Sequence, residues 1–183
     1  MRVTGGEARG VPLIAPRGSE TRPTADRVRE AIFSILYSMD ADLDRVLDLY
    51  AGTGALAIEA LSRGGAYACL VERAAPACAV IRQNLTRARV AERARLLCAE
   101  AATTLGRVEG GPFTLVFLDP PYALDGVCGV IEAVVAAGLL APEGTVVLEH
   151  AWRRPIEVPG ALALYADHRY GDTGVAFFRR EEA

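Results

Sequence analysis

The stretch "FLDPPY", residues 117–122, follows an apolar run and joins a carboxylate, two prolines and an aromatic ring. Proline has no backbone N–H, so a β-strand must end there. Asp119 and the carbonyl of Pro120 would then be fixed hydrogen-bond acceptors, with Pro121 stiffening the chain and Tyr122 offering a stacking face worth roughly 1–3 kcal/mol. Acceptors on the protons of an exocyclic amine position its nitrogen for attack. The stretch therefore predicts methyl transfer to the amino group of a nucleobase.

A second stretch, "DLYAGTGALA" at residues 48–57, predicts a cofactor loop. Gly52 and Gly54 fit the pattern G-x-G-x-x-A, which is typical of nucleotide-binding turns. A carboxylate at Asp48 would repel a pyrophosphate at the following helix N-terminus. S-adenosylmethionine carries a sulfonium and an ammonium but no phosphate, and glycines allow the backbone to approach it closely. We therefore predict this cofactor, with Asp48 attracting its ammonium directly or through water.

Acids end four successive predicted strands, at Asp48, Glu72, Glu100 and Asp119. In parallel sheets such positions meet at one edge, where ligands bind. Glu72 is predicted to accept hydrogen bonds from both ribose hydroxyls of the cofactor, and Glu100 to accept one from the adenine amino group. The alternative is that these acids only cap the helices that follow them. The predicted cofactor site comprises Asp48, Ala51, Gly52, Gly54, Glu72, Arg73, Glu100, Ala101 and Asp119.

The wider pattern alternates strands and helices after an initial helix near residues 24–39. Strands are expected at 45–50, 67–72, 93–100, 113–119 and 144–151, with helices at 55–64, 75–88, 101–108 and 126–140. Two further strands, 162–170 and 174–180, suit an antiparallel C-terminal hairpin. We expect an α/β fold of the Rossmann-like type, a mostly parallel seven-stranded sheet with helices on both faces. Residues 1–20 are predicted to form a small β-hairpin extension that contacts RNA, and residues 21–183 the catalytic domain.

Charge points to a nucleic-acid partner near the N-terminus. The net charge is −3 and all 20 basic residues are arginines, yet the first thirty residues hold six arginines against four acids. Arginine binds phosphate bidentately and stacks on bases. The predicted substrate-binding residues are Arg22, Thr24, Arg27, Arg29 and Tyr122, although Arg27 and Arg29 could instead lie on a solvated helix face.

Other features exclude several classes of protein. No apolar run reaches the ~18 residues of a membrane span, and the N-terminus lacks a signal-peptide core. The four cysteines form no C-x-x-C pair and the two histidines are far apart, so no metal site is expected. We expect a cytoplasmic monomer that does not bind membranes.

Together these stretches resemble a known family. "DLYAGTGAL" with "DPPY" is similar to class I S-adenosylmethionine-dependent amino-methyltransferases, and "RPTADRVREAIFSIL", "ALSRGG" and "RYGDT" resemble the RsmD-type family over nearly the whole chain. The resemblance implies methyl transfer to the exocyclic N2 of a guanine in bacterial 16S ribosomal RNA, as RNA or as the small ribosomal subunit. It also implies that Arg22 and Thr24 lie near the site's mouth. Glu100 departs from the family, which more often has Asp or Asn there.

Alternatives remain at this point. A NAD(P)-dependent oxidoreductase would explain the glycine loop but not the D-P-P-Y stretch, and an inactive RNA-binding module would not need the acids. Transfer to cytosine C5 needs a cysteine thiolate, which does not accompany residues 119–122. Transfer to adenine N6 or cytosine N4 of DNA or RNA is the main alternative. Guanine is favoured because an ionised carboxylate only accepts hydrogen bonds, and guanine presents N1–H beside N2–H.

Overall fold

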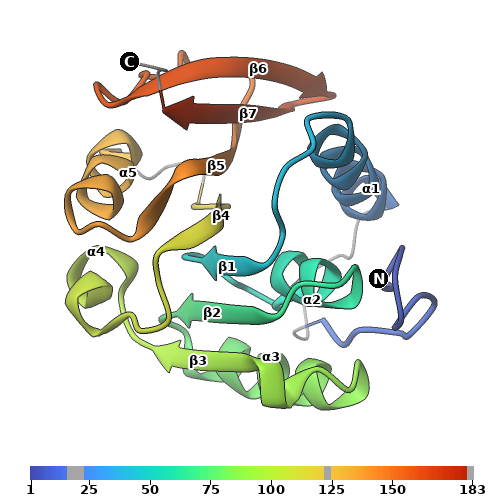
Figure 1. Ribbon diagram of the computed structural model, residues 1–183. Helices are drawn as coiled ribbons and strands as arrows, with labels where there is room; N and C mark the ends of the chain where they lie inside the picture. Colours follow the sequence, from blue (N-terminus) through green and yellow to red (C-terminus); the bar gives the residue numbers. More distant parts are fainter. Residues whose placement is uncertain (16–22, 122–124, 181–183) are drawn as a thin grey trace.

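A computed structural model describes residues 1–15, 23–121 and 125–180 (Figure 1). The helices are α1 (Pro23–Ser38), α2 (Ala55–Ser62), α3 (Ala75–Arg87), α4 (Ala101–Thr104) and α5 (Val127–Ala136), with short 3-10 turns at Ala91–Arg93 and Leu105–Arg107. The strands are β1 (Arg45–Asp48), β2 (Tyr67–Glu72), β3 (Ala94–Cys98), β4 (Phe113–Leu118), β5 (Leu140–Ala151), β6 (Leu162–Tyr170) and β7 (Thr173–Arg180).

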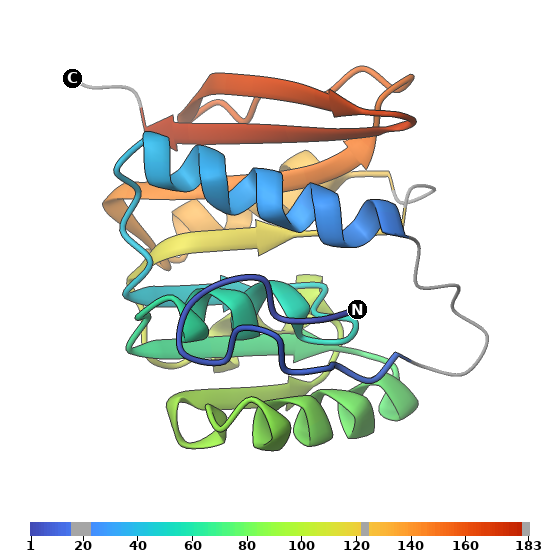
Figure 2. The same cartoon turned by 90° about the vertical axis from the view of Figure 1, so that its right-hand side faces the viewer.

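The seven strands form one sheet in the order β3-β2-β1-β4-β5-β7-β6. The strands β3, β2, β1, β4 and β5 run parallel, and β7 is antiparallel to both of its neighbours. In Figure 2 the arrowheads of the parallel strands accordingly point to one side and that of β7 to the other. The strand order reverses between β1 and β4, and ligands of such sheets bind at the carboxyl ends beside that reversal. The predicted α/β fold and C-terminal hairpin are confirmed.

Side chains of the central strands alternate between two apolar cores, because successive residues of a strand point to opposite faces. Val46 and Phe117 pack under α1, α2 and α3, whereas Leu47 and Val116 pack under α4 and α5. Figure 1 shows these two groups of helices on opposite faces of the sheet. Strands buried on both faces are continuously apolar, as "VLDL" and "FTLVFL" are. The site at their ends therefore stands on rigid elements.

The N-terminal segment is less regular than predicted. Within residues 1–15 the expected β-hairpin is reduced to a single antiparallel bridge, between Arg2 and Pro12. Val3, Ala8 and Leu13 are buried in the same core as α1 and α2. The segment therefore packs as part of the main body over these residues, and a boundary at residue 20 lies outside the described residues.

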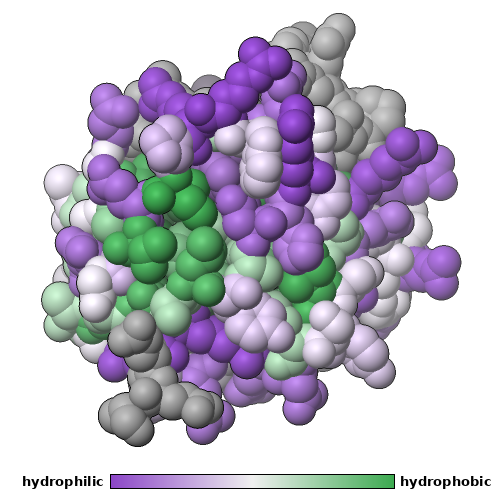
Figure 3. All heavy atoms as spheres, turned by 90° about the horizontal axis from the view of Figure 1, so that it is seen from above, coloured by the Kyte–Doolittle hydropathy of each residue, from purple (hydrophilic) through white to green (hydrophobic). Residues whose placement is uncertain are grey.

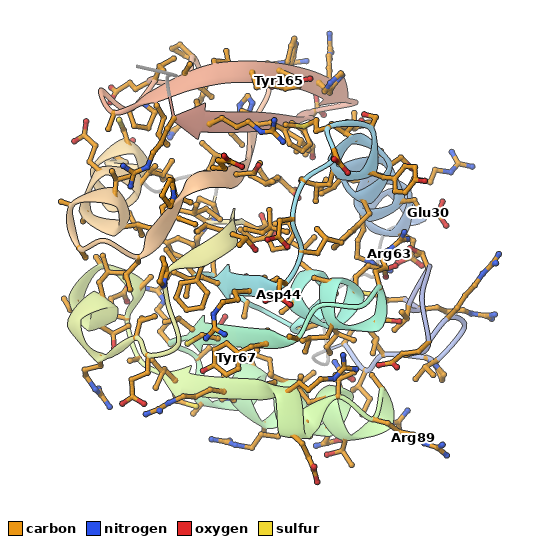
Figure 4. The ribbon with its side chains drawn as sticks, viewed as in Figure 1. Glu30, Asp44, Arg63, Tyr67, Arg89 and Tyr165 are labelled. Carbon is orange, nitrogen blue, oxygen red and sulfur yellow. The ribbon has the colours of Figure 1, made fainter. Side chains whose placement is uncertain are left out.

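A buried ionic cluster fixes this segment to the helices. Glu59 of α2 is fully buried and accepts hydrogen bonds from the Thr4 backbone and hydroxyl (2.8 and 2.6 Å), from Arg29 of α1 (3.3 Å) and from Arg63 (2.9 Å). Arg63, labelled in Figure 4, also lies 5.0 Å from the centre of the Phe33 ring. Removing one partner of a buried charge cluster costs about 3–5 kcal/mol. Arg29 is therefore a structural residue of the fold.

The far end of the sheet carries the outer strand β6. Figure 3 looks onto this end and shows groups of apolar side chains among charged ones. Val158, Leu164 and Tyr165 are exposed there. No helix within the described ranges is long and apolar enough to cross a membrane.

Candidate active site

A cavity of about 440 Å³ opens at the carboxyl ends of β1, β2, β3 and β4, beside the strand reversal. Six of the nine predicted cofactor residues line it: Gly52, Glu72, Arg73, Glu100, Ala101 and Asp119. Leu49, Tyr50, Ala99 and Glu149 also line it and were not predicted. The first three adjoin predicted residues, so extending each loop by one or two positions would have found them.

The glycine loop between β1 and α2 is shaped by backbone conformation. Gly54 precedes α2 with a left-handed φ of 77°, and an added Cβ would lie 3.2 Å from the Leu70 side chain. The left-handed φ favours glycine, and an added Cβ would also force the Leu70 side chain to shift by a few tenths of an ångström. Buried Asn84 of α3 braces the loop, because its amide donates to the Thr53 carbonyl (2.9 Å) and also bonds both backbone groups of Ile14. Gly54 itself supports the cavity from behind and does not line it.

Glu72, at the end of β2, is half-buried and faces the cavity. Its two carboxylate oxygens accept from the backbone N–H groups of Gly52 (2.9 Å) and Ala74 (2.7 Å). Each carboxylate oxygen has further acceptor capacity. The side chain therefore holds the glycine loop in place and keeps acceptor positions for ligand hydroxyls.

Glu100 lies across the cavity from this loop, just before α4. It forms an ion pair with exposed Arg73, at 3.3 Å. Ala101 follows and is buried at the cavity wall. The pair closes one side of the cavity, and an exposed pair of this kind contributes at most about 1 kcal/mol to stability.

Asp48 lies beneath the site. It is 1% exposed, lines none of the cavities described here, and neither carboxylate oxygen has a hydrogen-bond partner among the described residues. Burial raises the pKa of Asp48 to about 7, and the charge of Glu72 adds to the rise. The backbone N–H groups of Ala57 and Tyr50 lie near enough to oppose it, although neither has the geometry of a hydrogen bond. Asp48 does not reach the cavity in this structure, and its attraction of a cofactor ammonium, directly or through water, stays a prediction. An unpaired buried carboxylate still favours a cation nearby.

Asp119 directly follows β4, at the boundary between cavities. It lines the 440 Å³ cavity and a neighbouring cavity of about 340 Å³. Predicted Ala51 lines only the second of these. Asp119 is exposed as a residue, yet desolvation of its carboxyl group raises its pKa above the ordinary value, and the charges of Glu149 and Asp48 add to the rise. Pro120 and Pro121 separate the first cavity from another of about 490 Å³. Tyr122 lies outside the described residues.

The predicted substrate-binding arginines differ sharply from one another. Arg27 is exposed on α1. Arg29 is only 4% exposed, pairs with Glu59 and Asp26, and donates to the Arg2 carbonyl. Its guanidinium is already engaged by buried Glu59, half-buried Asp26 and the Arg2 carbonyl, so in this structure Arg29 holds the fold together rather than facing RNA phosphate. Arg22 and the side chain of Thr24 lie outside the described residues.

Comparison with known proteins now identifies the family. Residues 1–179 match the family model described as "Conserved hypothetical protein 95". The chain is 36% identical to YlbH of Bacillus subtilis (98% of this chain, 99% of the relative) and 33% identical to ribosomal RNA small subunit methyltransferase D of Escherichia coli (99% and 90%). The chain belongs to the RsmD family. The predicted family is thus confirmed, as is S-adenosylmethionine as the cofactor.

The solved structures agree with the RsmD assignment. The structure of yhhF from Escherichia coli superposes with a TM-score of 0.86 at 33% identity, over 100% of this chain and 99% of that one. The class I methyltransferase fold is therefore shown for the whole described sheet. The residues present also fit the cofactor, because the cavity offers acceptors for hydroxyls at Glu72 and places unpaired Asp48 behind a site for a cation.

Proposed function

We propose that this protein transfers the methyl group of S-adenosylmethionine to the exocyclic N2 amine of a guanine in small-subunit ribosomal RNA. The observation that carries the proposal is the position of Pro120, which lines both the cofactor cavity and a second cavity of about 490 Å³, next to Asp119, which lines the cofactor cavity. The printed name of the Escherichia coli relative, a small-subunit ribosomal RNA methyltransferase, supports the RNA class.

In this proposal Glu72 accepts the ribose hydroxyls, and the loop at Gly52 lies against the methionine part. Glu100 and Ala101 border the adenine. Asp48 acts through its field rather than by contact. The cofactor supplies an electrophilic methyl carbon, and this chain's residues bring the amine to it.

The amine must approach in line and become pyramidal, since its lone pair is otherwise delocalised into the ring. Asp119 and the Pro120 carbonyl accept its two N–H groups, which holds the nitrogen and favours the required geometry. As the N2–carbon bond forms, the carbon–sulfur bond breaks with its electrons going to sulfur, and one N2 proton leaves to Asp119 or water. Tyr122 is proposed to stack on the base, as aromatic residues do with unpaired bases.

The RNA backbone is proposed to contact exposed arginines on the same side as the N-terminal segment. Arg2, Arg9 and Arg27 are exposed, and Arg22 precedes α1 in sequence. Phosphate contacts supply most of the affinity for nucleic acid and make it depend on salt. We propose that the protein acts in the cytoplasm as a monomer on the RNA or the assembled subunit.

The test of substrate class uses S-adenosylmethionine with a tritiated methyl group. Small subunits, large subunits and naked 16S RNA, all prepared from cells lacking the enzyme, are offered separately. We expect incorporation into 16S RNA as naked RNA, as small subunits or as both, and none into large subunits. Incorporation into large subunits alone, or into none of these substrates, would refute the proposed substrate.

A further inference from the structure

Glu149 occupies a junction between three cavities that no sequence pattern indicated. It follows Leu148 of β5, and Leu148 pairs in register with Leu118 of β4, so Glu149 and Asp119 lie at the same level of neighbouring parallel strands. The cofactor cavity, the 490 Å³ cavity and the 340 Å³ cavity are all lined by Glu149. Among the described residues that line them, no other is shared by all three.

Its charge acts on the proposed catalytic acceptor. After desolvation, the charge of Glu149 is the largest contribution that raises the pKa of Asp119. Two neighbouring carboxylates repel each other. Hydrogen-bond donors that lie between them reduce this repulsion. Asp119 and Glu149 both line the cofactor cavity, and Glu149 also lines the cavity bounded by Pro120 and Pro121, where the proposed function places the base.

Guanine is the base whose edge supplies the donors. Its N2 amine carries two N–H groups and its N1 carries a third beside them, whereas adenine and cytosine present a ring lone pair next to the amine. An ionised carboxylate can only accept. One carboxylate could accept from both N1–H and N2–H, but Glu149, at the level of Asp119 on the next strand, offers a separate acceptor for N1–H and leaves Asp119 and the Pro120 carbonyl for the amine.

We propose that Glu149 accepts the N1–H of the target guanine and thereby selects guanine over other amino bases. The inference rests on the proposed function and deepens it. Glu149 is then a specificity-determining residue that contacts the substrate, while Asp119 and Pro120 hold the reacting amine. The competing explanation is that Glu149 serves only to attract the cationic cofactor, in which case base choice would not depend on it.

The experiment removes the N1 proton of the target base, together with its O6 atom, and compares how each enzyme variant responds to that change. The modified guanine of the RNA substrate is first mapped, and RNA is then prepared with guanine or 2-aminopurine at that position. 2-Aminopurine keeps the amine but has a lone pair at N1. Transfer rates are compared for the wild-type enzyme, Glu149→Gln and Glu143→Gln, the last a control at the exposed start of β5.

We expect the wild-type enzyme and Glu143→Gln to prefer guanine by about 100-fold or more, since a site built to bond a donor rejects an analogue that lacks it. Glu149→Gln should narrow the preference to less than about 10-fold, because its amide can donate to N1. Binding of S-adenosylhomocysteine to each variant shows that the site is folded. If Glu149→Gln does not bind it, Glu149→Ala takes its place, and the same narrowing is expected from loss of the repelling carboxylate.

An unchanged preference in the Glu149 variants, or a wild-type enzyme that methylates both bases equally, would overturn the inference while leaving the proposed function intact. A wild-type enzyme that modifies RNA but leaves guanine N2 unmethylated would refute the proposed function, and this inference with it.

Discussion

The unpaired carboxylate of Asp48 should make the folded protein less stable as the pH rises. Its pKa is about 7 in the folded state and 3.8 ordinarily. Below pH 4 both states hold the proton. Between pH 4 and 7 the folded state keeps a proton that the unfolded chain releases, so the free energy of unfolding falls as the pH rises. Above pH 7 the carboxylate is charged in both states, and the folded state bears the full destabilisation of a buried charge. At about 1.36 kcal/mol per pKa unit, this cost is about 4 kcal/mol.

Asp48→Asn removes the charge and nearly preserves the shape. From pH 5 to pH 8.5 about two thirds of the cost develops, so the variant should gain about 3 kcal/mol relative to the wild-type protein over that interval. Urea unfolding followed by circular dichroism at the two pH values measures this difference. Asp44→Asn is the matched control, because Asp44 is exposed just before the same strand and surface substitutions usually change stability by less than about 0.5 kcal/mol.

The same variant should bind S-adenosylmethionine more weakly, since the buried negative charge no longer favours a cation above it. Stability gained at the expense of ligand affinity is common at functional sites. A stability difference that stays constant between pH 5 and 8.5 would refute the reasoning, because Asp48 would then titrate alike in both states.

Four further substitutions test other parts of the account. Glu72→Ala should weaken binding of S-adenosylhomocysteine by about 10-fold or more in calorimetry, because it removes the acceptor and frees Gly52; unchanged affinity would exclude the assignment. Asp119→Ala should lower the transfer rate by about 10²-fold or more while cofactor affinity is kept, and an active variant would remove Asp119 from the mechanism. Arg29→Ala should destabilise the fold by about 3–5 kcal/mol in urea unfolding, whereas Arg27→Ala should leave stability nearly unchanged and weaken RNA binding with a shallower salt dependence. Equal effects of the two arginine substitutions on stability would contradict the burial difference between them.

Much of this architecture could be predicted from the sequence because its signals are local. Apolar runs such as "FTLVFL" mark buried strands, and Gly52, Gly54 and the two prolines mark the turns at their ends. The acids Glu72, Glu100 and Asp119 were found because a parallel sheet brings the ends of its strands to one edge.

The remaining features depend on contacts between distant segments. Arg27 and Arg29 are two residues apart on one helix, and only the packing of α1 against Glu59 of α2 shows that one is buried. Asn84 gives no local sign that it will brace the glycine loop. Glu149 was missed because β5 continues past it to Ala151, so it does not mark a strand end in the sequence.

The central claim is that a guanine N2 receives the methyl group. Small ribosomal subunits and 16S RNA from cells lacking the enzyme are incubated with it and with S-adenosylmethionine bearing a trideuterated methyl group, and the RNA is digested to nucleosides for mass spectrometry. We predict N2-methylguanosine with the deuterium label as the main product. Labelled N6-methyladenosine or N4-methylcytidine as the main product would contradict the account.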